Sequence, residues 1–203
     1  MKLITIVLVC ILVVVVLWIL TSRSERFGSV EPKCPKAQKE SRRLWYEHVR
    51  LTRIYLVKYL DDLPDLEDAT NVLMRNQEDI GSFIDSFVPG TGEAVTNLLK
   101  EHILGAVEIL KDTKEGRNIE QAVAEWYVNA DAISKALAPI LGLPEDKIKE
   151  MMHYHLKTTL DEATYHLTGD YESEEKAYCA VVKHIIEMAD YLVSNVPCSC
   201  NKR

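Results

Sequence analysis

Residues 148–166 read IKEMMHYHLKTTLDEATYH. An α-helix repeats every 3.6 residues, so Met152, His155, Thr159 and Glu162 lie on one stripe of a helix formed by this run. The stripe begins apolar and becomes polar toward its end. It therefore predicts a helix that faces a protein core and carries polar groups into it.

The same spacing of three or four residues extends over residues 38–196, and no run in that range is typical of a strand. Turn signals interrupt the pattern at residues 63–65, 89–92, 116, 142–144 and 169–170. Pro64, Gly116 and Gly169 follow one another at intervals of 52 and 53 residues. This period favours three copies of one helical hairpin over six helices whose similar lengths match by chance. We predict an all-α domain in which six helices form an up-and-down bundle of three hairpins.

Four of the predicted helices carry a histidine near their middle: His48, His102, His155 and His184. In an up-and-down bundle, mid-helix positions meet at the same height whichever way each helix runs. The histidines are therefore expected to lie in one inward-facing polar layer. Its other expected members are Asn76, Asp79, Asn129, Asp131, Thr159, Glu162, Glu187 and Asp190.

Two interpretations of this layer remain open, because buried polar groups must either pair with one another or bind something. In the first, the layer binds a divalent metal such as iron, zinc or manganese. The candidate ligands are His48, Asp79, His102, Asp131, His155, Glu162 and His184. In the second, each histidine hydrogen-bonds a neighbouring Asn, Asp or Thr and fixes the register of the bundle.

Catalytic motifs give no support to a particular reaction. The Glu-x-x-His spacing of ferritin-like diiron bundles is absent, as are G-x-S-x-G and H-E-x-x-H. The catalytic residues are therefore not identified, and the sequence leaves open whether the protein is an enzyme.

The N-terminal run from residue 3 to residue 20, LITIVLVCILVVVVLWIL, has no charge, proline or glycine. At 1.5 Å per residue it spans roughly 27 Å, enough for a bilayer core. No small-residue cleavage site follows, so we expect an uncleaved single-pass anchor rather than a signal peptide. Basic residues after the run place the helical domain in the cytoplasm. The predicted organisation is an anchor at 1–22, a linker at 23–37, the bundle at 38–196 and a tail at 197–203.

The net charge of −7 argues against a nucleic-acid partner, which would require a basic surface, so the membrane is the one partner that the sequence predicts. The five cysteines contain no C-x-x-C pair, which excludes a zinc ribbon. Their odd number argues against a disulfide framework. A single bridge from Cys34 to Cys198 or Cys200 remains an alternative in an oxidising compartment.

Several runs resemble an uncharacterised family of helical proteins from bacteria and large DNA viruses. They are residues 44–49 (LWYEHV) with Thr52 and Arg53, 75–81 (RNQEDIG), 98–103 (LLKEHI), 126–131 (WYVNAD), and His155, Leu156, Thr158, Thr159 and Glu162. The resemblance covers residues 40–195 and leaves out the hydrophobic run. It implies a helical domain that folds without an anchor, and it implies no activity. Two functions are therefore expected: a membrane-tethered metal-binding domain, or a structural or interaction module such as a viral membrane component.

Overall fold

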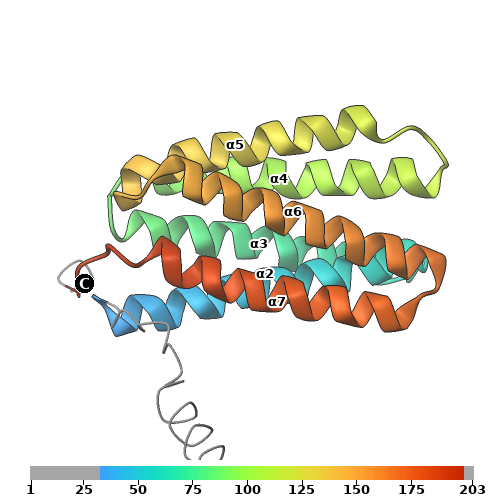
Figure 1. Ribbon diagram of the computed structural model, residues 1–203, viewed down its shortest axis with the longest axis horizontal. Helices are drawn as coiled ribbons and strands as arrows, with labels where there is room; N and C mark the ends of the chain where they lie inside the picture. The colour runs from blue at the N-terminus through green and yellow to red at the C-terminus, as the bar shows by residue number, and fades with distance from the viewer. Residues whose placement is uncertain (1–32, 199–203) are drawn as a thin grey trace, which may run out of the picture. The chain divides into compact units, whose positions relative to one another are not determined.

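The computed structural model describes residues 33–198 of the chain, and these form six α-helices joined by short turns (Figure 1). The helices are α2 (Pro35–Leu60), α3 (Leu66–Asp85), α4 (Gly92–Lys114), α5 (Glu120–Leu141), α6 (Glu145–Thr168) and α7 (Tyr171–Leu192). No strand occurs within residues 33–198. The predictions of an all-α fold and of six helices are therefore confirmed.

The predicted anchor, residues 1–22, and most of the predicted linker lie outside the described residues. Between residues 33 and 198, no helix combines the length and the hydropathy that a membrane span requires. The chain divides between residues 31 and 32, inside the predicted linker. Helix α2 begins at Pro35, ahead of the predicted start at residue 38, because the fixed φ of proline and its missing N–H suit a first helical turn.

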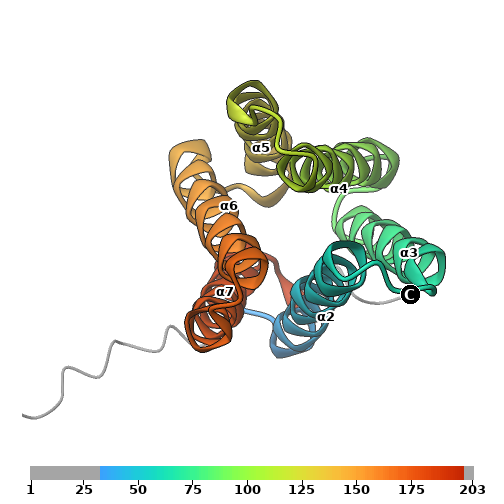
Figure 2. The same ribbon diagram turned by 90° about the vertical axis from the view of Figure 1, so that its right-hand side faces the viewer.

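The six helices form a closed ring in which each helix packs against its neighbours in the chain and α7 returns to pack against α2 (Figure 2). Helix α2 also contacts α4 and α6 across the interior. The short turns make successive helices antiparallel (Figure 1). Residues near the middle of each helix therefore approach one another inside the ring, as the predicted polar layer requires.

Local sequence signals determine where the helices begin and end. Gly142 after α5 and Gly169 after α6 have φ of 63° and 72°, a left-handed backbone that favours glycine at a helix C-terminus. The carboxylate of Asp170 accepts a hydrogen bond from the backbone N–H of Ser173 and caps α7. These signals set the lengths of the helices and so the heights at which their inward residues meet.

Two apolar clusters fill the ring. The first includes Leu44, Trp45 and Val49 on α2, and the second begins on the same helix at Leu51. His48 of α2 lies close to this boundary. His102 on α4 likewise lies between Leu99 of the first cluster and Ile103 of the second. The polar layer is therefore placed where the two apolar clusters meet.

Candidate functional site

Three imidazoles come together inside the ring, each from a different helix. The ring centroids of His48 and His155 are 5.8 Å apart, and those of His102 and His155 are 6.4 Å apart. All three side chains are buried, with relative exposures of 2–3%. We call these three residues the imidazole triad.

Side chains of the neighbouring helices hold two members of the triad. Nδ1 of His48 lies 3.3 Å from Nε2 of Gln77, which donates to it, and Nδ1 of His102 lies 2.9 Å from Oδ1 of Asn129, to which it donates. The Trp126 ring stacks on His102 at 5.0 Å, and its Nε1 donates to the His102 carbonyl oxygen at 2.8 Å. These contacts orient both imidazoles.

The third member, His155, is different because its Nδ1 is buried and has no hydrogen-bond partner. Its main-chain carbonyl oxygen accepts a hydrogen bond from the hydroxyl of Thr159 at 2.9 Å. Thr159 therefore belongs to the layer as predicted but satisfies the helix backbone rather than the imidazole. The free Nδ1 is the one unsatisfied imidazole nitrogen among the buried polar atoms of residues 33–198.

Burial keeps the imidazole triad uncharged. It lowers the pKa of His48 to about 3, with a smaller effect from the neighbouring His102. It lowers the pKa of His102 to about 4. Burial also holds the pKa of His155 well below its usual range, and the other histidines add to the effect. The triad is therefore a set of three neutral imidazoles at pH 7, the form that binds a transition metal.

The fourth predicted histidine does not join the triad. His184 is half-buried between α6 and α7, where its Nε2 donates to the carbonyl oxygen of Met151 at 2.8 Å. Its ring lies edge-on to Tyr154 at 4.6 Å. The sequence spacing placed His184 on the inward stripe of α7, but the rotation of that helix turns the residue toward the α6–α7 interface.

The predicted carboxylates also lie away from the triad. Asp79 and Glu187 are exposed. Asp131 pairs with Lys149 and with His153, at 2.5 and 2.7 Å, and Asp190 pairs with Arg42 at 2.5 Å. Within residues 33–198, no group of three or more His, Cys, Asp or Glu side chains is arranged to hold a metal ion. The seven predicted ligands therefore do not form one centre, because four of them point to other parts of the domain.

The remaining predicted carboxylate, Glu162, lies in a separate buried ionic cluster. Its Oε1 is 3.5 Å from Nη1 of Arg53, whose Nη2 is 3.1 Å from Oε1 of Glu174. The other oxygen of Glu174 is 3.0 Å from Nδ1 of His166, and Nε2 of His166 is 3.2 Å from Asp61. Burial raises the pKa of Glu162 to about 7, although Arg53 opposes the effect. This cluster links α2, α6 and α7.

The two predicted asparagines tie adjacent helices together. Nδ2 of Asn76 on α3 donates to the carbonyl oxygen of Leu44 on α2 at 3.2 Å, and Nδ2 of Asn129 on α5 donates to that of Leu98 on α4 at 3.1 Å. Each contact joins the second helix of a hairpin to the first. The two asparagines are 53 residues apart, which is the period of the predicted repeat, and they make equivalent hydrogen bonds.

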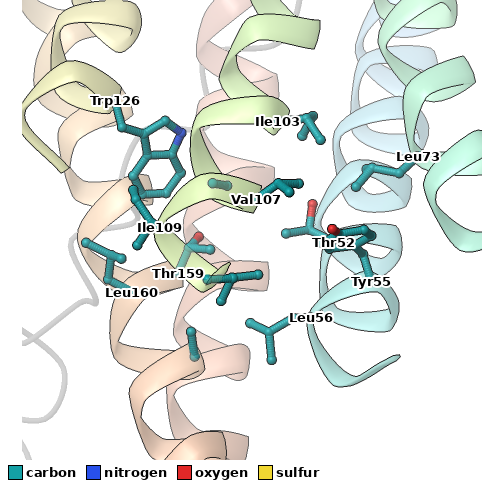
Figure 3. A pocket seen from close by; sticks show the side chains of 13 residues that line it. Thr52, Tyr55, Leu56, Leu73, Ile103, Val107, Ile109, Trp126, Thr159 and Leu160 are labelled. Carbon is teal, nitrogen blue, oxygen red and sulfur yellow. The ribbon is translucent and has the colours of Figure 1, made fainter. Parts of the chain in front are cut away.

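A small apolar cavity of about 30 Å³ lies beside the layer (Figure 3). Aliphatic side chains such as Leu73, Ile103 and Leu160 line it, together with the Trp126 ring and the hydroxyl-bearing Thr52. The space is about that of one water molecule in the liquid, and its walls offer few hydrogen bonds. A cavity of this size and polarity does not accommodate a substrate or an organic cofactor.

Three residues of the triad's surroundings and of the ionic cluster, Gln77, Arg53 and Glu174, were not among the predicted site residues. Gln77 falls at 4-3 spacing between Leu73 and Ile80, the same spacing that identified the histidines, so it was open to prediction. Arg53 and Glu174 gave no such signal, because charged residues at those positions are equally typical of a solvated helix face. Only the contact between α2 and α7 shows that they are paired.

No protein-family model, no curated protein and no solved structure matches the chain. The case for a function therefore depends on the geometry of the triad and its surroundings.

Proposed function

We propose that this chain is a single-pass membrane protein whose helical domain is a structural or interaction module without catalysis, such as a viral membrane component. In this proposal residues 3–20 are the anchor, and the basic residues that follow keep the domain in the cytoplasm. Membership in the helical family of bacteria and large DNA viruses is part of the same proposal. The polar layer then fixes the register of the bundle.

The observation that carries this proposal is the pairing of the layer with protein groups. The side-chain amides of Asn76 and Asn129 donate hydrogen bonds to main-chain carbonyl oxygens of neighbouring helices. His48 and His102 are paired with a carboxamide each. Polar groups satisfied in this way specify one alignment of the helices and leave little capacity for a substrate.

A substitution at Asn129 tests the structural role. Asn129→Leu in the full-length chain in detergent micelles removes a cross-helix hydrogen bond and leaves the His102 Nδ1 donor without its partner, so the free energy of unfolding should fall by about 1–3 kcal/mol. The matched control is Asn97→Leu, at an exposed position on α4. Equal stability of the two variants would contradict the structural role of the layer.

Alkaline carbonate washing of membranes that contain the full-length chain tests the anchor. We expect the protein to stay in the membrane fraction, and we expect a variant that lacks residues 3–20 to be released. Release of the full-length chain would show that the hydrophobic run is not an anchor.

One observation favours a second candidate function, the binding of a metal ion by the imidazole triad. Three neutral imidazoles lie within 6.4 Å of their neighbours by ring centroid, and Nδ1 of His155 is buried without a partner. Imidazole nitrogens bind zinc at about 2.0–2.1 Å, so the rings would have to turn toward one point. Neutral imidazole suits zinc, iron or copper.

Cobalt(II) and zinc(II) titrations of the full-length chain separate the two functions. Metal binding predicts one equivalent of bound ion, lost in His155→Ala and kept in His153→Ala, whose side chain lies on the same helix but pairs with Asp131. The structural module predicts no stoichiometric ion in either variant or in the parent chain. One equivalent bound through the triad would replace the structural proposal by the metal-binding one.

A further inference from the structure

The two ends of the helical domain meet, and each end carries a cysteine. Cys34 is the N-cap residue of α2 and is 1% exposed. Cys198 follows α7 and is exposed. The two thiols lie close enough that each shifts the pKa of the other, although 163 residues lie between them in the chain.

Other contacts hold the two ends in this arrangement. Nζ of Lys33 donates to Oδ1 of Asn195 at 2.9 Å, and Nδ2 of Asn195 donates to the carbonyl oxygen of Gly142 at 2.8 Å. Val196 is 4% exposed and belongs to the same apolar cluster as Cys34. The segment that precedes Cys198 is therefore packed against the start of α2, and the contact between the thiols is part of a built junction.

We propose that Cys34 and Cys198 form a reversible disulfide that fastens the C-terminal tail to the start of α2. The proposal rests on the packed junction and does not depend on the function of the imidazole triad. In the cytoplasm, where the domain is proposed to lie, such a bond forms transiently in response to an oxidant. The oxidant is a low-molecular-weight disulfide such as oxidised glutathione, which acts by thiol–disulfide exchange.

The two thiols have different roles in this exchange. The exposed Cys198 thiolate attacks the small disulfide, forms a mixed disulfide and releases one small thiol. The Cys34 thiolate then attacks Sγ of Cys198, forms the protein disulfide and releases the second small thiol. Two protein thiols are thereby oxidised by two electrons, and one small disulfide is reduced to two thiols. The packed junction already holds the two cysteines close together, and the disulfide bond that forms is about 2.05 Å long.

The surroundings of Cys34 suit the second step. Its thiol lies at the N-terminus of α2, where the contact with Cys198 and the backbone N–H groups of Ala37 and Lys36 lower its pKa. A helix N-terminus stabilises a thiolate, and the thiolate is the attacking species. Burial shields Cys34 from the small disulfide, so its accessible route to oxidation passes through Cys198.

Redox titration of the full-length chain in detergent micelles tests the proposal. The protein is equilibrated with oxidised and reduced glutathione at several ratios, free thiols are alkylated, and non-reduced peptides are analysed by mass spectrometry. We expect a cross-link between the peptides of Cys34 and Cys198 that reduced glutathione removes. It should persist in Cys179→Ser, which removes an exposed free thiol on α7, and in Cys200→Ser.

Two results would overturn the proposal: Cys34 fully alkylated under the most oxidising ratio, or Cys34 linked to Cys200 as abundantly as to Cys198. The melting temperature gives an independent readout. Because the disulfide closes a long loop, oxidation should raise the melting temperature by about 5–10 °C. The increase should vanish in Cys198→Ser, which should melt like the parent chain under reducing conditions; an equal increase in that variant would contradict the assignment.

Discussion

The buried carboxyl of Glu162 predicts an unusual pH dependence of stability. Burial raises its pKa to about 7 in the folded domain, against an ordinary 4.5. The folded state therefore holds a proton between about pH 4.5 and 7 that the unfolded chain has released. Across that interval the contribution of Glu162 to stability falls as the pH rises, and above pH 7 it is constant.

The size of the effect follows from the same two values. The difference between about 7 and 4.5, at about 1.4 kcal/mol for each pH unit, makes the cost of ionising Glu162 about 3 kcal/mol above pH 7. Glu162→Gln removes the ionisation and keeps a polar group beside Arg53, which retains Glu174 and Glu175 as partners. We expect the variant to be about 2–3 kcal/mol more stable than the parent chain at pH 8 and about equal to it near pH 4.5.

Denaturant unfolding of the full-length chain in detergent micelles at pH 4.5, 6 and 8 measures this difference. The fluorescence of the buried Trp45 and Trp126 monitors the unfolding. Other titrating groups contribute equally to both proteins, so the difference isolates Glu162. The control is Glu175→Gln, which removes an exposed partner of the same Arg53 and should change stability by less than about 1 kcal/mol. A difference that does not vary with pH, or a Glu162→Gln variant less stable than the parent at pH 8, would refute the reasoning.

Two further predictions concern the interior and a close approach between α3 and α4. Burial lowers the pKa of His102 to about 4, so the contribution of this residue to stability is complete above pH 6.5 and is lost as the pH falls toward 4. His102→Asn should therefore flatten the decrease in the free energy of unfolding over that pH range. An unchanged slope would show that His102 does not cause the decrease. Gly81 on α3 faces Gly92 of α4, where an added Cβ would lie 2.7 Å from the Gly92 carbonyl oxygen. Gly81→Ala should therefore lower the melting temperature through about 2 kcal/mol or more of overpacking, whereas the adjacent exposed Ser82→Ala should change it little; equal melting of the two variants would contradict this close approach.

The helical bundle was accessible from the sequence because its causes are local. The spacing of apolar residues along 148–166 and its counterparts reports which face of each helix is buried, and glycines such as Gly142 and Gly169 report where helices stop. The same spacing identified His48 and His102 as buried residues. Asn129 was expected beside them for the same reason, and its hydrogen bonds to His102 and Leu98 agree with that expectation.

The composition of the site was less accessible, because a stripe on a helix gives its direction only to within a broad arc. His184 shares the spacing of inward residues, but a small rotation of α7 places it beside Met151 instead. Asp131 was expected in the layer only from its height along α5, and it pairs with Lys149. The metal ligands predicted from spacing alone were therefore too many. Which of them meet depends on how each helix is rotated about its axis, and packing decides that rotation.

The sequence by itself determined that this chain has an apolar N-terminal run and six amphipathic helices with histidines near their middles, because periodicity and turn residues act over short distances. Only the tertiary structure decided that three of the histidines form the imidazole triad. It also decided that Glu162 is buried beside Arg53 and that Cys34 meets Cys198. The first two outcomes depend on contacts of α2 with α4 and α6 across the interior, and the third depends on the contact of α2 with α7 that closes the ring; no local pattern encodes these contacts.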